Sequence, residues 1–353
     1  MTAKDAEATI IALAVTLILV PSVGLACRRF GILDYPGPLK IHTRPVPRLG
    51  GIAIAVAIGA GILAARVILF KQWPVLAAFA LLWLVGLIDD LHGLPPLIRL
   101  GAQVLSGLFL WRAGFGVPVG NAALSLLATS LLVVLCVNAW NFWDGADGLA
   151  AGVAGIAALV FFLQPTRAGS SLGDLACILA GTCAGFLIFN FPRARALTFL
   201  GDSGSTLLGL ALALLTLDFY RSNDASLSVV LFPFLVAALP LLDATFAVIR
   251  RVRRSRSPLR GDRRHIYDLA FARGWPPRKV ALACYGVTLL FAAVGSLAMR
   301  SRSALVLPIG AVATIAFIIM AVRLGCLRTE ETIPARGKSK FKLKGIRSSQ
   351  GAA

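Results

Sequence analysis

Long apolar runs dominate this sequence and exclude most soluble folds. The chain has 353 residues, of which 58% are hydrophobic and only 14% are charged. A soluble domain of this size has too little interior to hide so much apolar surface from water. Lipid is therefore the solvent for most of the chain, and the sequence predicts an all-α, polytopic bundle of membrane-spanning helices.

We expect about eleven spans, judged by the length that a helix needs to cross the hydrocarbon core. The first run is long and begins with mixed charges, unlike a cleavable signal peptide, so we expect it to be retained as a span. The runs are 8–27, 50–65, 73–88, 100–110, 122–142, 149–163, 175–191, 203–217, 227–248, 280–299 and 304–322.

Basic residues orient these spans. Lys and Arg are concentrated in alternate loops, notably 28–48 and 250–279, and the positive-inside rule makes these loops cytoplasmic. An odd number of spans then places the N-terminus outside and the C-terminus in the cytoplasm. We expect residues 1–327 to form one membrane domain and residues 328–353 to form a basic, disordered cytoplasmic tail.

Net charge and cysteine content exclude other classes. A charge of +19 can indicate a nucleic-acid partner, but here the basic residues flank apolar runs, where they meet lipid headgroups, so we expect none. The six cysteines form no C-x-x-C pair and lie mostly within apolar runs. They are predicted to be small buried side chains and not disulfides or zinc ligands.

Acidic residues at the ends of the apolar runs are more informative, because ionisable groups at membrane depth are costly and are kept mainly where they function. Asp89 and Asp90 close the third run, and Arg99 follows ten residues later. Adjacent carboxylates repel unless a cation is near. Two solvated carboxylates at a helix end would give the same pattern, so this pair alone does not establish a site.

A second polar cluster lies between two apolar runs. Asn138, Asn141, Asp144 and Asp147 fall within ten residues, with Gly145 and Gly148 among them. Carboxylate and amide oxygens suit hard cations such as Mg²⁺, and the glycines allow a tight turn close to a ligand. The cluster lacks the later glutamate of a calcium-binding EF-hand loop. An ordinary structural turn remains an alternative, since the same residue types dominate turns.

The eighth run opens with Gly201, Asp202, Ser203, Gly204 and Ser205. The letters resemble a serine-protease nucleophile segment, but no β-rich scaffold supports that reading. We instead expect the backbone N–H groups at this helix start to bind phosphate, with Asp202 as a metal ligand.

A basic loop at 250–273 contains Arg263, Arg264 and His265. Arginine pairs with phosphate by charge and by bidentate geometry, although contact with lipid headgroups explains most arginines of such a loop. Together the four clusters favour phosphoryl transfer at a membrane surface, where a metal and arginines offset developing negative charge.

In order and spacing, these motifs resemble the polyprenyl-phosphate N-acetylhexosamine-1-phosphate transferase family over about residues 30–275. Residues 138–149 resemble its N-x-x-N-x-x-D-G-x-D-G-L signature, and residues 201–209 resemble its G-D-x-G-S-x-x-x-G signature. The segment 34–51, which contains Lys40 and His42, resembles its first cytoplasmic loop.

The resemblance implies roles for individual residues. Asp202 and Asn141 would hold Mg²⁺, or Mn²⁺ in its place, and Asp89, Asp90, Asp202 and His265 would be the catalytic residues. The acceptor phosphate would be activated beside Asp89, and an acceptor oxygen would attack the sugar-bearing phosphorus as UMP leaves. Direct attack and a covalent aspartyl intermediate both remain open. The substrate-binding residues would be Asn138, Asp144, Asp147, Arg99, Arg263, Arg264 and Lys40.

The resemblance also implies partners and a location. The partners would be a UDP-amino sugar, undecaprenyl phosphate and membrane lipid, and a homodimer is left open. The enzyme would lie in a bacterial inner membrane with its site on the cytoplasmic face, and would start a cell-envelope polymer such as O-antigen of lipopolysaccharide, capsule or teichoic acid.

One departure from the family pattern bears on the donor. His265 is followed by Tyr267 and Asp268, where further histidines often stand in the family. This loop is associated with sugar recognition, so the departure argues against the MurNAc-pentapeptide branch. UDP-GlcNAc is the favoured donor, and a related sugar such as UDP-N-acetylfucosamine is the alternative.

Two other classes fit less well. A transporter or flippase also uses intramembrane carboxylates, but it usually places them near the midplane and in repeated units. In this chain the acidic residues lie at the ends of runs, and no repeat is evident. A non-catalytic membrane anchor would leave the Asn and Asp clusters unexplained.

Overall fold

The protein is almost entirely helical. The computed structural model describes residues 3–36, 44–67, 72–164, 172–191, 197–224, 226–255, 257–258, 261–300 and 306–328. Its first half contains α1 (Ala3–Arg29), β1 (Leu33–Asp34), β2 (Val46–Pro47), α2 (Gly50–Ala65), α3 (Trp73–His92), α4 (Pro96–Arg112), α5 (Ala122–Trp143) and α6 (Leu149–Phe162). Its second half contains α7 (Leu172–Asn190), α8 (Gly201–Arg221), α9 (Leu227–Val236), α10 (Ala238–Arg253), α11 (Ile266–Ala272), α12 (Pro277–Arg300) and α13 (Val306–Leu324).

The prediction of an all-α membrane protein is confirmed, and over its described residues each of the eleven apolar runs coincides with one or more helices to within a residue. The count of eleven spans is not supported. Among the described residues, six helices are long and apolar enough to cross a membrane, namely α1, α3, α5, α7, α8 and α12. The run 227–248 forms a bent pair, α9 and α10, with an angle of 76° between them, and it could serve as a seventh span.

Length explains the difference from the expected count. Helices α2, α4 and α6 have 17 residues or fewer, and the part of α13 that counts as an apolar helix, Pro308–Leu324, is no longer. At about 1.5 Å per residue they reach at most about 26 Å, short of a hydrocarbon core of about 30 Å. The sequence located the helices correctly, but an apolar run shorter than the bilayer does not establish a crossing. The expected orientation of the two termini stays a prediction.

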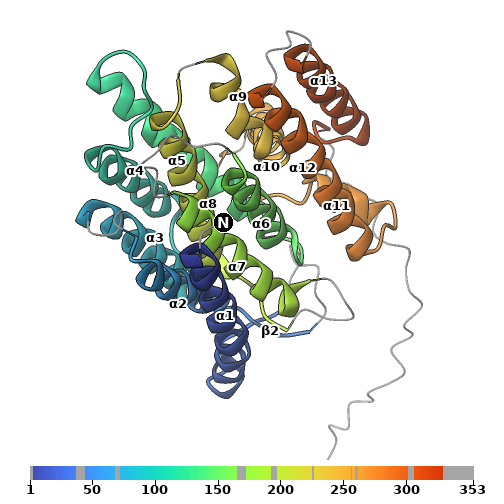
Figure 1. Cartoon of the computed structure of the whole chain (residues 1–353). Helices are drawn as coiled ribbons and strands as arrows, with labels where there is room; N and C mark the ends of the chain where they lie inside the picture. Colours follow the sequence, from blue (N-terminus) through green and yellow to red (C-terminus); the bar gives the residue numbers. More distant parts are fainter. Residues whose placement is uncertain are drawn as a thin grey trace, which may run out of the picture.

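Helix α8 forms the centre of the bundle, and α3, α5, α6 and α7 lie around it (Figure 1). Every residue from Ser203 to Tyr220 is buried. Glycines bring the neighbouring helices close. A Cβ on Gly86 of α3 would lie 2.6 Å from the Cα of Ser203, and a Cβ on Gly209 would overlap Val137 of α5. Such close helix contacts are typical of membrane bundles.

The two short strands hold the start of α8 in place. They pair antiparallel, with Leu33 opposite Pro47. The residues just before α8 bond to β2 and to the start of α2. Phe199 donates its N–H to the carbonyl of Pro47 at 2.8 Å, and Gly51 donates its N–H to the carbonyl of Leu200 at 2.8 Å. The beginning of α2 and the beginning of α8 are therefore tied together by backbone hydrogen bonds.

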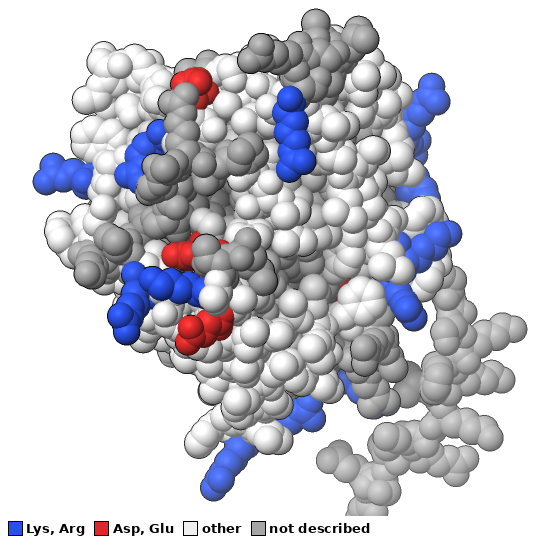
Figure 2. Space-filling view, viewed as in Figure 1, with Lys and Arg blue, Asp and Glu red and all other residues white. Residues whose placement is uncertain are grey.

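The exterior fits a lipid environment. In the face shown in Figure 2, most described atoms are uncharged, and Lys and Arg side chains project mainly at its periphery. Many large apolar side chains are exposed, among them Ile10 and Ile18 of α1 and Leu63 of α2. Contiguous apolar surface of this kind marks a membrane-embedded protein. The chain is a multi-pass membrane protein.

Candidate active site

The N-terminus of α8 receives its cap from another helix. The first N–H groups of a helix lack partners within that helix. Asp90, in the last turn of α3, accepts hydrogen bonds from the backbone N–H groups of Asp202 at 2.9 Å and Ser203 at 3.0 Å, and from Ser203 Oγ at 2.7 Å. Arg48 Nη2 lies 3.6 Å from Asp90 Oδ1. Asp90, predicted as catalytic, is thus buried, and the hydrogen bonds that its carboxylate accepts hold the start of α8.

Gly201 allows this arrangement. Its φ of +74° lies in the left-handed region, which favours glycine. A Cβ at this position would also lie within 2.8 Å of both carboxylate oxygens of Asp90. The predicted phosphate-binding helix start therefore has its first N–H groups occupied by Asp90 in this structure.

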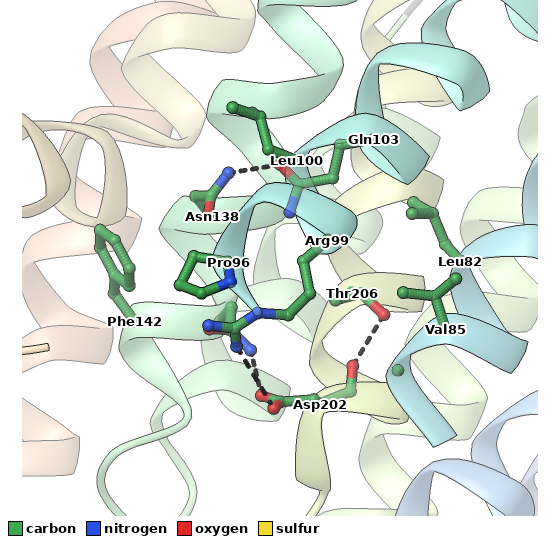
Figure 3. A pocket seen from close by; sticks show the side chains of 12 residues that line it. Leu82, Val85, Pro96, Arg99, Leu100, Gln103, Asn138, Phe142, Asp202 and Thr206 are labelled. Carbon is green, nitrogen blue, oxygen red and sulfur yellow. Dashed lines mark hydrogen bonds and ion pairs between the residues drawn. The ribbon is translucent and has the colours of Figure 1, made fainter. Parts of the chain in front are cut away.

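Asp89 has separate partners. It accepts from the N–H of Leu94 at 2.5 Å and from Arg99 Nη1 at 2.8 Å. Arg99, in the first turn of α4, also lies 3.7 Å from Asp202 Oδ2. The turn at Gly93–Pro95 reverses the chain and makes this contact possible. Arg99 therefore joins the predicted catalytic residues Asp89 and Asp202; Figure 3 shows its guanidinium beside Asp202.

Asp202 is also joined to the second polar cluster. Asn141 Nδ2, near the end of α5, lies 2.5 Å from Asp202 Oδ1 and 3.1 Å from Ser205 Oγ. The predicted metal pair, Asp202 and Asn141, thus meets across α5 and α8. Asn138, one turn earlier on α5, donates to Gln103 Oε1 of α4 at 2.6 Å.

These side chains surround a small cavity of about 40 Å³, about the size needed for one water molecule (Figure 3). Its polar lining comes from α4, α5 and α8, and its apolar lining comes from α3, α4 and α5. The lining residues are Leu82, Val85, Gly86, Pro96, Arg99, Leu100, Gln103, Asn138, Asn141, Phe142, Asp202 and Thr206. A cavity lined by both polar and apolar side chains can hold a small polar group next to the apolar faces of the helices.

The donor set fits Mg²⁺ bound together with a phosphate ligand. Among the described residues, no three His, Cys, Asp or Glu side chains are close enough to hold a metal alone. Mg²⁺ is commonly held by one or two protein oxygens, with substrate phosphates and water completing its octahedron. Asp202 and the amide of Asn141 could supply such oxygens, since 28% of the Asp202 side chain is exposed.

Asp144 and Asp147 lie in the turn that joins α5 to α6. Burial, followed by the negative charges of Asp202, Asp90 and Asp147, raises the pKa of Asp144 well above its ordinary value. The turn is held at Gly148, whose N–H donates to Asn190 at 2.8 Å and whose carbonyl accepts from Tyr285 at 2.6 Å.

The basic loop forms a separate buried cluster. His265, predicted as catalytic, is only 4% exposed, and Asp243 Oδ2 of α10 lies 2.6 Å from its Nδ1. Within the described part of the chain, its side-chain polar contacts are with Asp243 and Asp262. It meets the cavity only indirectly, through the ring of Phe142, whose centroid is 5.5 Å from its own.

The remaining predicted residues differ in placement. Arg263 is partly exposed and lies 3.6 Å from Asp268, and Arg264 is buried. Both belong to the loop that carries His265. Lys40 and His42 lie outside the described residues, as does the tail after Arg328.

Sequence reasoning missed Asp243, Gln103 and Arg48. Asp243 is the only acidic residue in the apolar run 227–248, and Gln103 is the only amide in the run 100–110. Both stood out as polar exceptions within apolar runs, the same signal that identified Asp89 and Asp202. Arg48 had no such signal, because it lies among other basic residues of the first loop.

The sequence is similar to those of a known family of transferases. Residues 72–220 match the model of Glycosyl transferase family 4. The chain is 33% identical to the decaprenyl-phosphate N-acetylglucosaminephosphotransferase of Mycobacterium tuberculosis, covering 88% of this chain and 87% of the relative. It is 30% identical to the probable undecaprenyl-phosphate N-acetylglucosaminyl 1-phosphate transferase of Bacillus subtilis (84% and 85% covered). It is 32% identical to the phospho-N-acetylmuramoyl-pentapeptide-transferase of Moorella thermoacetica (81% and 96% covered).

Proposed function

The chain belongs to glycosyl transferase family 4, among the polyprenyl-phosphate N-acetylhexosamine-1-phosphate transferases, and on this premise we propose that it transfers GlcNAc-1-phosphate from UDP-GlcNAc to undecaprenyl phosphate. The observation that carries the proposal is the meeting of Asp202, Asn141 and Arg99 in the lining of one small cavity between α3, α4, α5 and α8. A nucleotide diphosphate and a lipid phosphate both need cationic partners, and both would meet at the end of the membrane helices.

Asp202 and Asn141 would hold Mg²⁺, with Mn²⁺ as a substitute. When bound, the ion would neutralise charge on the diphosphate of the donor. Arg99 would contribute a fixed positive charge from the protein itself. Its guanidinium is oriented by Asp89 at 2.8 Å, so that little rearrangement would be needed when phosphate arrives.

The reaction exchanges one bond to phosphorus for another. An oxygen of the acceptor phosphate forms a bond to the sugar-bearing phosphorus of the donor, and the bond from that phosphorus to the bridging oxygen breaks. The bridging oxygen leaves with UMP. Asp89 and Arg99 would position the acceptor phosphate, and Asp90 would keep α8, and with it Asp202, in register. Such catalysis consists chiefly of positioning and charge stabilisation.

The setting follows from the same premise. Two of the relatives named above, from Mycobacterium tuberculosis and Bacillus subtilis, are named for decaprenyl phosphate and undecaprenyl phosphate. The site would face the cytoplasm from the inner membrane, and the product would begin a cell-envelope polysaccharide. The basic loops that flank the site favour this orientation.

A second donor is favoured by one observation in the basic loop. Tyr267 is stacked on His265, with 9° between the rings, and its hydroxyl donates to the carbonyl of Phe142 at 2.9 Å. This stacked tyrosine ring stands where many family members have a further histidine. A related donor such as UDP-N-acetylfucosamine is therefore the alternative to UDP-GlcNAc.

A donor panel tests the proposal. The purified protein in detergent would receive undecaprenyl phosphate, Mg²⁺ and one UDP-sugar at a time, and UMP release would be followed. We expect UMP from UDP-GlcNAc only when acceptor and Mg²⁺ are both present, and none after chelation. UMP from another UDP-N-acetylamino sugar alone would replace the donor assignment. A folded protein that releases no UMP from any donor would refute the proposal and leave the flippase alternative.

A further inference from the structure

Asp243 is a buried carboxylate that links three elements. It lies on α10, is 1% exposed, and belongs to an otherwise apolar run. Its Oδ2 is 2.6 Å from His265 Nδ1 and accepts from Trp143 Nε1 at 3.1 Å, while its Oδ1 accepts from the N–H of Ile266 at 2.9 Å. One side chain thus connects α10, the end of α5 and the start of α11. A buried carboxylate is costly unless it is satisfied in this way.

These contacts fix the ring of His265. With Nδ1 held by a carboxylate, an imidazole has a defined orientation and a defined proton position. The ring is stacked on Tyr267, with centroids 5.4 Å apart, and lies beside Phe142. Its other nitrogen, Nε2, lies 3.9 Å from Asp262 Oδ1.

Arginines complete the cluster. Arg250 Nε and Arg251 Nη2 contact the two oxygens of Asp262 at 2.6 and 3.0 Å, and Arg251 lies over the ring of Phe142. Burial disfavours the charged imidazole, but the carboxylates of Asp243, Asp268 and Asp262 together outweigh burial and raise the pKa of His265. The ionisable groups of the cluster around His265 are Asp243, Asp262, Asp268, Arg250, Arg251 and Tyr267.

We propose that Asp243 is a positioning residue of the transferase: through His265 and the start of α11, it fixes the basic loop 261–265 against Phe142, the residue that lines the cavity beside Asp202. The inference rests on the proposed function and adds to it. These contacts join the loop to the end of α5 and so fix the backbone from which Arg263 and Arg264 extend. Groups that orient a functional histidine commonly contribute about 10- to 100-fold to activity.

A direct test measures the His265 imidazole itself. The chain has only three histidines, so His265→Gln assigns its NMR signal in a histidine-labelled sample. We expect His265 of the wild type to titrate above its ordinary pKa of about 6.5, and Asp243→Asn to lower that pKa. An unchanged titration in a folded Asp243→Asn protein would overturn the proposal. This readout does not depend on activity.

Turnover then tests the consequence. Asp243→Asn should lower kcat/KM for the UDP-sugar at least about tenfold. Asp218→Asn is the matched control, because Asp218 is equally buried and paired with Arg221 at the opposite end of α8. It should keep wild-type activity. The double variant Asp243→Asn/His265→Gln should lose less activity than the product of the two single losses, since the two side chains share the Nδ1 contact while Asp243 also holds Ile266 and Trp143.

The outcomes separate the two proposals. Additive losses in the double variant would overturn the role of Asp243 through His265. Equal losses in Asp218→Asn and Asp243→Asn would reduce Asp243 to a folding residue and also overturn it. Absence of UMP release from the wild type with every donor would instead refute the proposed function, while the NMR titration would still decide whether Asp243 controls His265.

Discussion

Asp90 and Asp202 lie next to each other at the start of α8 but differ in exposure. The Asp90 side chain is 1% exposed and accepts three hydrogen bonds, whereas the Asp202 side chain is 28% exposed and lines the cavity. A buried carboxylate with a full set of donors has little capacity left for a ligand. At the residue scale, we therefore expect Asp202 to contact substrate and Asp90 to support the structure.

Removing the charge of Asp202 should abolish transfer without unfolding the protein. Asp202→Asn keeps the size of the side chain but removes the charge that would face the metal and phosphate, so we expect UMP release to fall by at least about a hundredfold. Thermal unfolding in detergent should stay close to that of the wild type. Substantial turnover in the purified variant would contradict the assignment of Asp202 as a metal ligand.

Replacing Asp90 should act on stability first. Asp90→Ala leaves the N–H groups of Asp202 and Ser203 without partners in a buried setting, which should cost about 1–3 kcal/mol. The measurement is the unfolding midpoint in detergent, compared with Asp202→Asn. If Asp90→Ala unfolds like the wild type but is inactive, Asp90 acts in catalysis and not as the cap of α8.

The pairing of Asp202 with Asn141 was predictable from sequence, because both belong to oxygen-rich clusters at the ends of apolar runs. The cap supplied by Asp90 was not, because it joins residues 112 positions apart in the chain. It depends on how closely α3 approaches α8, and residue spacing contains no such information. The catalytic role of His265 was implied by the family resemblance and stays a prediction; the structure places its ring behind Phe142, outside the lining of the cavity.

At the scale of elements, the contact between α3 and α8 places the carboxylates. A Cβ on Gly86 would lie 2.6 Å from Ser203 Cα, which is backbone and cannot move aside cheaply. Gly86→Ala should therefore push the helices apart, lower stability by about 1–3 kcal/mol and reduce turnover. Gly59→Ala is the control, since a Cβ there meets nothing within 4 Å. Equal behaviour of the two variants would show that close packing at Gly86 is not required.

The ion pairs that Asp262 makes with Arg250 and Arg251 should make the free energy of unfolding depend on pH in the acid range. Although burial alone would raise it, Arg250 and Arg251 hold the pKa of Asp262 at about 2. Because this value lies below an unfolded pKa of about 3.9, the stabilisation is present above about pH 4 and is lost as the pH falls through about 2.

The stabilisation of the folded state by the ionised Asp262 is about 2 kcal/mol. Asp262→Asn should remove this part of the acid dependence of unfolding, whereas Asp224→Asn on the exposed α8–α9 connection should keep it. An identical acid profile for wild type and Asp262→Asn would show that the arginines do not stabilise the carboxylate.

The positions of the helices were well predicted, but the number of helices that cross the membrane was not. Apolar runs mark helices because backbone groups in lipid must be paired within the segment. Whether a run crosses depends on its length and on bends such as the 76° break between α9 and α10, which its continuous apolar letters did not indicate. Asp243 was overlooked in that same run, since its partners come from α5 and α11.

At the scale of the whole molecule, the basic loops and tail predict that the two ends of the chain lie on opposite sides of the membrane. Single cysteines introduced at Ala3 and Arg328 should react with an impermeant maleimide from the outer and the cytoplasmic face, respectively. All six native cysteines are buried, so background labelling should be slow. Labelling of both positions from one face would require an even number of spans.

The central claim concerns which bond is broken, and it is tested most directly by following the phosphorus. The wild type would be incubated with undecaprenyl phosphate, Mg²⁺ and UDP-GlcNAc labelled at the β-phosphorus. Transfer of the sugar phosphate predicts that the label enters the lipid fraction while unlabelled UMP is released. Labelled UDP in the aqueous phase, with sugar on the lipid, would show transfer of the sugar alone and would contradict the account.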